Sequence, residues 1–449
     1  MTATKPLTGI YQWLSKPVSA APLTVFRIAF GIMMLAAIIR FAANGWIESL
    51  YIKPSYFFTY YGFEWVKPLN ATGMYAVFAL LMLCAAGIAL GLFYRLSAIL
   101  FFLLFTYVEL IDKTNYLNHY YFISIMALLL VLLPANRYVA LDVKLKLSKA
   151  ANAVPKWALL TLQLQMAVVY FFAGIAKINA DWLLHAQPLK IWLANPRFDY
   201  GVVGHWLAQE WVAYAFSWCG MLFDVCIPFF LFNRRTVWFA YALVVVFHLL
   251  TTLLFPMIGM FPFIMIVCAT VFLPVAFHAK LLSAFGTNNK TVPEVAKSFA
   301  SKWIVAVLAL HFFVQVLLPF RYLLYPGQLF YTEEGFRFSW RVMLMEKAGC
   351  VFFYVRDKQS GKQVEINNRD YLTMQQEKQM STQPDMILQF ARHLKTVYHT
   401  KFADPEVYAE AHVSLNGRST RLLLNPNIDL SMEEDNLKHK TWIIAGMGE

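Results

Sequence analysis

Charged side chains are scarce in this sequence: Asp, Glu, Lys and Arg together make up 14% of its 449 residues. Soluble domains carry about 25% of these residue types, so the low content excludes an ordinary soluble protein. Hydrophobic types supply 59% of the chain, and aromatic types 17%, including 13 Trp and 23 Tyr. Trp and Tyr are typical of membrane–water interfaces. The composition therefore predicts an integral membrane protein in contact with lipid.

Cysteine is also rare, with five residues in the chain. None forms a CxxC pair, which argues against a disulfide-exchanging quinone reductase and against a cysteine-rich zinc site. A site built from three of the histidines lacks any spacing motif, so we predict no metal. The formal charge of +12 is explained by basic cytoplasmic loops, and we expect no nucleic-acid partner.

Nine apolar runs of spanning or near-spanning length are present, and they predict a membrane all-α fold of about nine transmembrane helices. They lie at 21–41, 73–93, 96–111, 119–134, 157–177, 211–232, 236–255, 258–275 and 301–319. If the N-terminus is cytoplasmic, the basic residues of the loops gather on its side. These are Arg95; Arg137, Lys144, Lys146, Lys149 and Lys156; Arg234 and Arg235; and Lys280, Lys290, Lys297 and Lys302.

The composition changes after residue 320, where alternating and helical patterns predict a small C-terminal extramembrane α+β domain. We expect strands at 337–345 and 349–355, a helix at 385–398, and a hairpin around Asn416-Gly417. This divides the chain into a multi-pass transmembrane catalytic domain, 1–320, and an extracytoplasmic domain, 321–449. The stretch 178–210 is too interrupted to span, and it predicts a segment that covers the outer mouth of the helices.

One polar stripe runs along the helix expected at 157–177. Its members are Gln163, Tyr170, Gly174, Lys177 and Asp181, which recur at spacings of 7, 4, 3 and 4 and so share one helix face. Such a stripe should face protein or a water-filled cavity, because lipid offers no polar partners. A buried lysine with a lowered pKa is a credible general base, whereas a lysine that snorkels to the headgroups is the simpler alternative.

Further polar groups are predicted in the outer half of the membrane. They are Asn118, His119, His248, His311 and Gln315. Asn118 and His119 are expected near Lys177, because both segments meet the membrane on the outer side. Asp224 is expected to pair with a neighbouring helix or with Arg234, and Lys113 to snorkel or to pair with Asp112. Each histidine alone could equally be a core residue bonded to a carbonyl.

Three segments together resemble the vitamin K-dependent gamma-glutamyl carboxylase family, including bacterial members built on the horizontally transferred transmembrane domain. Asp112-Lys-Thr-Asn-Tyr-Leu-Asn-His-Tyr120 is similar to its DKTxxxNHxY element, and the run from Tyr170 to Trp182 to its AGxxKxxADW element. Phe247 to Met260 is similar to its histidine helix with the following turn. The resemblance covers residues 21–345.

The resemblance implies a site and a reaction. Lys177 takes the position of the base that deprotonates vitamin K hydroquinone, and His119 joins it as a catalytic residue. His119 and Asn118 both match the groups beside the quinone head and are cofactor-binding candidates. We add Tyr170, His248, His311 and Gln315 as cofactor-binding candidates. The implied reaction uses O2 to convert the hydroquinone to its epoxide, and the strong base so generated lets a glutamate side chain capture CO2.

Three functions stay open at this stage. The first is a carboxylase of the carbon–carbon lyase class, acting on a glutamate-containing peptide or protein. The second is a hydroquinone epoxidase without carboxylation, and the third is a transporter or scaffold whose polar residues line a path. The expected location is a bacterial inner membrane, with the N-terminus cytoplasmic and the C-terminal domain outside. The oligomeric state is not predicted.

Overall fold

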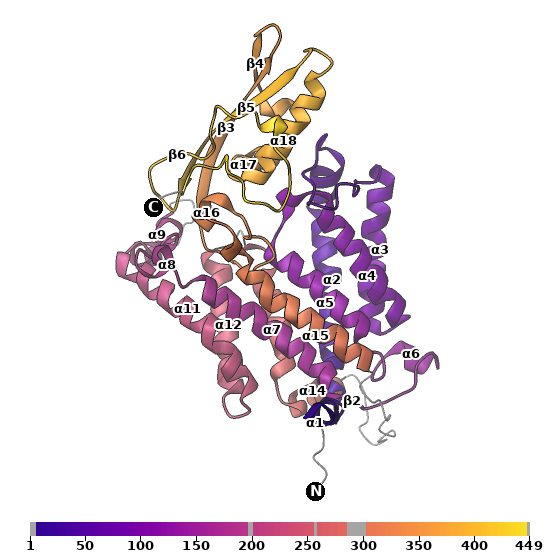
Figure 1. Cartoon of the computed structure of the whole chain (residues 1–449). Coiled ribbons are helices and arrows are strands. Elements are labelled where there is room, and N and C mark those ends of the chain that lie inside the picture. Colours follow the sequence, from indigo (N-terminus) through magenta and orange to yellow (C-terminus); the bar gives the residue numbers. More distant parts are fainter. Residues whose placement is uncertain (1–5, 196–200, 256–257, 285–301, 447–449) are drawn as a thin grey trace.

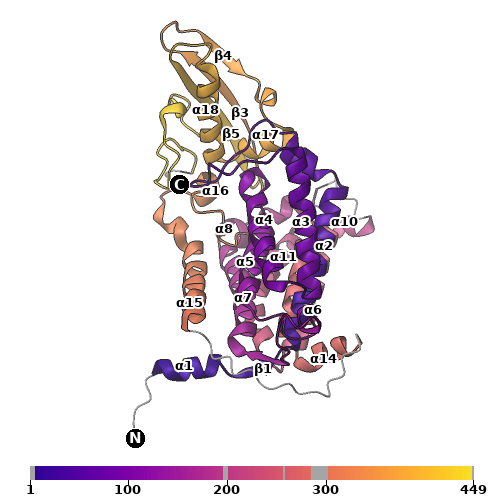
Figure 2. The same ribbon diagram turned by 90° about the vertical axis from the view of Figure 1, so that its right-hand side faces the viewer.

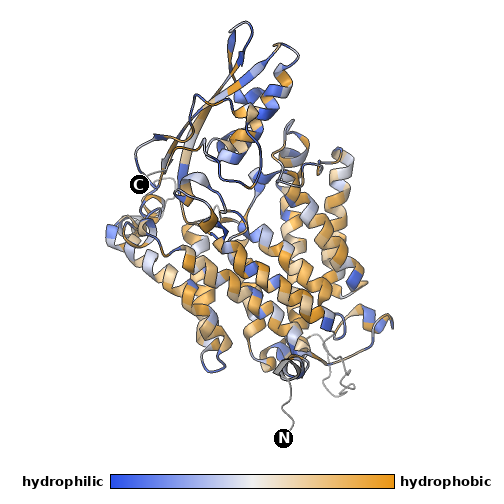
Figure 3. Ribbon diagram, viewed as in Figure 1, coloured by the Kyte–Doolittle hydropathy of each residue, from blue (hydrophilic) through white to orange (hydrophobic). Residues whose placement is uncertain are grey.

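The computed structural model describes residues 6–195, 201–255, 258–284 and 302–446. A bundle of long helices carries a smaller unit of strands and helices at one end, and the N-terminus lies at the opposite end (Figure 1). Hydrophobic residues dominate the bundle, whereas the smaller unit is mixed (Figure 3). The apolar surface thus follows the bundle, as expected of helices that face lipid.

Seven helices among the described residues are long and apolar enough to cross a membrane. They are α2 (Ala21–Ala43), α3 (Ala71–Leu90), α4 (Tyr94–Ile111), α7 (Lys156–Ala176), α11 (Glu210–Phe232), α12 (Val237–Leu254) and α15 (Lys302–Leu317) with its 3-10 extension η5 (Leu318–Leu324). An eighth span results if α13 (Phe261–Ala269), η4 (Thr270–Phe272) and α14 (Val275–Ser283) are taken as one, although the chain bends there by 108°.

The expected count of nine spans is therefore not confirmed. The run expected at 119–134 forms α5 (Asn118–Leu132), whose 15 residues reach about 22 Å at helical rise. This is less than the roughly 30 Å thickness of a hydrocarbon core. The run expected at 258–275 is interrupted before Pro274, because the residue preceding a proline is pushed out of the helical region; Leu273 is extended.

Short elements connect the long helices. At the N-terminal end, α1 (Pro6–Leu14) leads into β1 (Pro17–Ser19), which pairs antiparallel with β2 (Ala153–Pro155) just before α7. The other short pieces are η1 (Glu48–Ile52), η2 (Lys113–Asn115), α6 (Leu141–Lys144), α8 (Ala180–Leu183), α9 (Leu189–Leu193) and α10 (Val202–Leu207). The last three make up the segment expected to cover the outer mouth.

The C-terminal unit is a four-stranded antiparallel sheet with helices packed on it. The sheet order is β4-β3-β5-β6. Its elements are α16 (Leu329–Thr332), β3 (Lys347–Asp357), β4 (Gln363–Ile366), η6 (Asn368–Asp370), α17 (Met374–Met380), α18 (Pro384–Tyr398), β5 (Pro405–Leu415), β6 (Arg421–Leu422) and η7 (Leu430–Met432). Alternate residues of β5 are buried and pack with the apolar face of α18.

Most expected C-terminal elements are confirmed. The strand at 349–355 lies within β3, the helix at 385–398 within α18, and the hairpin turns at Asn416 and Gly417, both with positive φ. The strand expected at 337–345 is wrong. Phe338, Trp340 and Met343 have positive φ, which no regular strand permits, so this segment folds irregularly against the bundle.

A buried cluster of charges joins the C-terminal unit to the bundle. Asp385 of α18 accepts hydrogen bonds from Lys113 Nζ at 2.8 Å and from Arg337 Nη1 at 2.7 Å. Next to it, Gln376 donates to Asp112 at 2.8 Å. The expectation that Lys113 snorkels or pairs with Asp112 is wrong, since Lys113 is buried and its partner lies in the C-terminal unit. The motif that begins at Asp112 therefore serves first as a docking site.

Replacing Asp385 by Asn should loosen this junction. Burial acts to raise the pKa of Asp385, but the charges of Arg337 and Lys113 outweigh it and hold that pKa well below its usual range. Without the carboxylate, the buried Lys113 and the partly buried Arg337 lose their counter-charge, at a cost on the order of 2–3 kcal/mol for this partly accessible group. Thermal unfolding in detergent measures the loss, and Asp370→Asn, at an exposed carboxylate, is the control.

The same carboxylate gives a pH dependence of known sign. Because its folded-state pKa is lowered, the stability it contributes is present above the ordinary carboxyl pKa of about 3.9 and is lost as the pH falls through the folded-state value. The wild-type chain should therefore lose more stability than Asp385→Asn on acidification below about pH 4. Parallel acid profiles of the two proteins would contradict this assignment.

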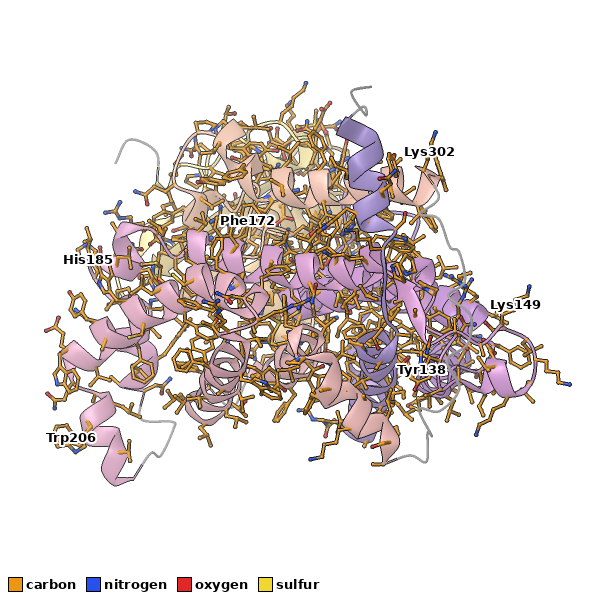
Figure 4. The ribbon with its side chains drawn as sticks, turned by 90° about the horizontal axis from the view of Figure 1, so that it is seen from below. Tyr138, Lys149, Phe172, His185, Trp206 and Lys302 are labelled. Carbon is orange, nitrogen blue, oxygen red and sulfur yellow. The ribbon has the colours of Figure 1, made fainter. Side chains whose placement is uncertain are left out.

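The arrangement also supports a test of orientation. Lys149 and Lys302 lie at the periphery of the bundle when it is viewed from the N-terminal end (Figure 4); Lys290 and Lys297 fall outside the described residues. Reporter tags after Ala150 and Arg235 should read as cytoplasmic, and a tag at Gln359 as external. A cytoplasmic reading at Gln359 would overturn the proposed orientation.

Candidate active site

Helix α7 presents Lys177 to its neighbour α11. The helix ends at Ala176, and Lys177 is its C-terminal cap. Gly174 makes the approach of the two helices possible, since a Cβ at this position would lie 2.6 Å from the backbone N of Val225. A larger residue would force the helices apart. The small residue one turn before the lysine thus brings Asp224 of α11 within reach.

Lys177 is buried and ion-paired. Its Nζ lies 2.8 Å from Asp224 Oδ2 and 3.2 Å from the Ala173 carbonyl oxygen. Both side chains of the pair are 8% exposed. Snorkelling to the headgroups is therefore wrong for Lys177, and of the two partners expected for Asp224, the one on a neighbouring helix is correct. A buried pair that shares one proton carries no net charge, which makes it tolerable in this apolar setting.

The pair forms part of the wall of a cavity of about 320 Å³. Its lining is almost entirely apolar and comes mainly from α7, α11, α12 and α13. Trp182, Leu189 and Trp192 also line it; they belong to the segment of α8, α9 and α10, called here the outer segment. Val342 and Met343 of the C-terminal unit complete the wall. The outer segment thus covers the site, as expected. Trp182 is fixed over α11 by a hydrogen bond from its Nε1 to the Ser217 carbonyl at 2.8 Å.

Two further polar groups reach this cavity. The Tyr170 hydroxyl and His248 Nε2 lie 2.9 Å apart, both buried. His248 Nδ1 is buried, and no described residue forms a hydrogen bond with it. An unpartnered buried nitrogen is costly, which makes His248 Nδ1 an unusual group in the lining of this apolar cavity. The structure therefore brings Lys177, Tyr170 and His248 together.

His119 lines a separate cavity of about 290 Å³ with Glu109 and Tyr120. The ring of Phe261 lies next to both histidines, 6.0 Å from His119 and 5.8 Å from His248 between centroids. The expectation that His119 stands beside Lys177 is therefore not met: an aromatic ring lies between the two cavities, because α13 enters there.

Asn118 does not line the Lys177 cavity, but it forms a hydrogen bond to a segment of the cavity wall. Its Nδ2 donates to the Arg341 carbonyl at 2.8 Å, and its Oδ1 accepts from the Tyr116 hydroxyl at 3.1 Å. The next two residues after Arg341 are Val342 and Met343, which line the cavity. Asn118 thus positions the segment through which the C-terminal unit closes the site.

His311 and Gln315 belong to another network. His311 Nε2 lies 2.8 Å from Gln165 Oε1, and Gln315 Nε2 donates to the Tyr121 hydroxyl at 2.9 Å. Neither residue lines the Lys177 cavity. These contacts join α15 to α7 and α5, so the five polar positions expected in the outer half are not all brought to one place. In the part of the chain that the structure describes, no cluster of metal-binding side chains occurs.

Asp181, the last member of the predicted stripe, faces the C-terminal unit. Its carboxylate accepts a hydrogen bond from Asn416 Nδ2 at 2.6 Å and is bound by both terminal nitrogens of Arg418. Burial acts to raise the pKa of Asp181, but these hydrogen bonds outweigh it and lower that pKa. The chain just beyond Lys177 is therefore anchored to the turn between β5 and β6.

Asp224, Trp192 and the 342–343 segment were missed as site residues. An acid within an apolar run was the available signal for Asp224, since such residues mark functional positions in membranes. For Val342 and Met343 the sequence offered no signal, because their place depends on the irregular backbone between Phe338 and Met343.

Two family models match the chain. An HTTM domain covers residues 15–277, which is more than half of the sequence, and the vitamin K-dependent gamma-carboxylase lumenal domain covers residues 300–449. No solved structure matches. The first match includes all four cavity helices, and the second includes the unit that closes the cavity. The chain therefore belongs to the HTTM-domain family and, with its lumenal domain, is a member of the gamma-carboxylase family.

Proposed function

We propose that the protein is a vitamin K-dependent gamma-glutamyl carboxylase, a carbon–carbon lyase that couples epoxidation of the hydroquinone to carboxylation of glutamate in a peptide or protein. The observation that carries the proposal is the Lys177–Asp224 pair, 2.8 Å apart in the wall of an apolar cavity. Ionisable residues inside a membrane domain are rare and costly, and they mark functional positions.

The cavity suits a hydroquinone. Its volume of about 320 Å³ and apolar walls match a flat aromatic head, since ligand pockets of roughly 300–1,000 Å³ hold drug-sized molecules. The unpartnered His248 Nδ1 offers a hydrogen bond to a ring hydroxyl. The hydroquinone, when bound and oxygenated, supplies the strong base that removes the γ-proton of glutamate.

The Lys177–Asp224 pair has the protonation chemistry that such a ligand requires. Transfer of one proton from the Lys177 ammonium to Asp224 would leave Nζ with a lone pair that can accept a hydroxyl proton. The resulting ammonium remains beside Asp224 and the Ala173 carbonyl, both within 3.2 Å of Nζ. Tyr170 orients His248 through the 2.9 Å contact, and the Trp182 ring, centred 5.4 Å from Nζ, excludes water from this side.

The remaining site residues have narrower proposed roles. Asn118 is a positioning residue through Arg341. His119 would reach the ligand only if the Phe261 side chain turned aside, and we keep it as a proposed catalytic residue on that condition. A hydroquinone contact for His311 or Gln315 stays a prediction, because their contacts support packing of α15.

We also propose that catalysis resides in residues 1–320, with 321–449 as an external domain and the N-terminus cytoplasmic. The second family model begins at residue 300 and so groups α15 with that external domain. The proposed location of the protein is a bacterial inner membrane. Closure of the cavity by Val342 and Met343 supports a substrate that approaches from the external side.

One assay separates the candidate functions. Purified protein is incubated with vitamin K hydroquinone, labelled bicarbonate, O2 and a Glu-containing peptide. Epoxide together with labelled peptide supports the carboxylase. Epoxide alone indicates an epoxidase without carboxylation, and the absence of both products would favour a transporter or scaffold.

A further inference from the structure

A second cavity, of about 360 Å³, lies on the other face of α7. Phe172, Ile175 and Ala176 line it, whereas Val169, Tyr170 and Ala173 face the cavity of Lys177. The opposite wall comes from η5, the start of α16 and the segment that contains Ser339 and Arg341. The C-terminal unit therefore contributes to both cavities: Arg341 lines this second cavity, and Val342 and Met343 line the cavity of Lys177.

Arg341 is a buried cation to which the described residues offer no counter-charge. It is 8% exposed, and its Nε has no hydrogen-bond partner. Its guanidinium stacks on Tyr322, 4.4 Å from the ring centroid, and Nη2 lies 3.5 Å from the Pro319 carbonyl. No carboxylate among the described residues forms an ion pair with it, and burial lowers its pKa.

Two neighbouring arginines are neutralised. Arg337 is paired with Asp385, and Arg418, which lines the same cavity, binds Asp181. Because Asp181 is already held by Arg418 and Asn416, it is not available to Arg341. An uncompensated buried charge is strongly unfavourable, so an anion in this cavity would be bound by Arg341.

The rim of the cavity is apolar and lies along the lipid-facing side of the bundle. Ile178 and Phe320 of its lining are 54% and 42% exposed. Helix α15, which continues into η5, runs along one edge of the bundle (Figure 2), and its spanning window is 17% buried. A ligand could therefore enter sideways from the membrane, with its polar end inward.

We propose that this cavity binds the oxyanion headgroup of a membrane amphiphile, with a carboxylate or phosphate on Arg341 and the apolar tail along Phe172 and Phe320. Arginine suits either anion, because its nitrogens form charge-assisted hydrogen bonds in a fixed fork. The Tyr322 ring holds the guanidinium in place before the ligand arrives. The proposal is independent of the chemistry at Lys177.

The test uses full-length protein in a neutral detergent, with oleate and phosphatidylglycerol as separate probes, and binding is measured by native mass spectrometry. Arg341→Gln should weaken binding roughly 10- to 100-fold, the loss expected for charge-assisted hydrogen bonds to one guanidinium. Arg341→Lys should retain part of the affinity. Arg369→Gln, at an exposed arginine paired with Glu377, is the control and should bind normally.

The two probes distinguish the sources of the anion. Binding of oleate alone identifies a fatty-acid carboxylate, and binding of phosphatidylglycerol alone identifies a phospholipid phosphate. Methyl oleate lacks the charge and should not bind to the wild-type protein. This comparison does not depend on whether the Arg341 variants fold. Equal affinity for oleate and methyl oleate, equal affinity of wild type and Arg341→Gln, or binding of neither probe would overturn the proposal.

Discussion

Lys177→Arg is expected to retain the fold and to lose epoxide formation. Arginine can keep an ion pair with Asp224, 2.8 Å from the native amine, but its guanidinium does not lose a proton at accessible pH. General-base terms are worth on the order of 100- to 10,000-fold in rate, and turnover should fall by that factor. Epoxide formation is measured against pH for both proteins.

Lys177→Ala is the companion variant, and it should be equally inactive but less stable. It leaves Asp224 buried without its partner, at a cost of about 3–5 kcal/mol unless the carboxyl takes up a proton. The arginine variant therefore separates catalysis from folding more cleanly. Near-wild-type turnover in Lys177→Arg would mean that the residue supplies charge rather than accepts a proton, and the assignment as a base would be abandoned.

The second large effect concerns Asp224. Asp224→Leu should destabilise the protein by about 3–5 kcal/mol, because the ammonium of Lys177 is left buried without a counter-charge. The double variant Lys177→Met/Asp224→Leu removes both charges and should recover most of this stability, since an apolar pair of similar volume often replaces a buried ion pair at little cost. Both variants should be inactive. Thermal unfolding and epoxide formation are measured in parallel.

Additive losses in the double variant would contradict a direct pair between the two side chains. Normal turnover in Asp224→Leu would remove Asp224 from the mechanism while leaving Lys177 in place. The matched comparison is Asp142→Asn, at a buried acid of the opposite end of the bundle that receives hydrogen bonds from the backbone of Phe93 and Tyr94. It should affect stability without a specific loss of epoxidation.

Local patterns in the sequence were sufficient for much of the fold. The apolar runs placed the long helices, and Asn416-Gly417 placed a hairpin, because glycine and asparagine tolerate the positive φ that such turns need. The polar stripe on α7 correctly grouped Tyr170 with Lys177. These features depend on neighbours within a few residues, which is the range over which a sequence pattern carries information.

Contacts between distant segments were not predictable in the same way. Asp224 lies 47 residues from Lys177, and the two meet because Gly174 lets α7 and α11 approach. Phe338 and Trp340 alternate with polar residues as in a strand, yet the backbone N–H of Phe338 is held by the Tyr116 hydroxyl at 2.8 Å. Such tertiary hydrogen bonds fix positive φ values that local propensity disfavours.

The anchoring of Asp181 by Asn416 and Arg418 has a consequence for how the protein is made. Asn416 and Arg418 lie 235 and 237 positions after Asp181 in the chain. Helix α7 therefore leaves the ribosome more than 230 residues before the turn that binds Asp181. During that interval Asp181 and Lys113 have no partners from the C-terminal unit. The newly inserted helices therefore lack both anchors at first, and a chain interrupted before Asn416 would never form the anchor of Asp181.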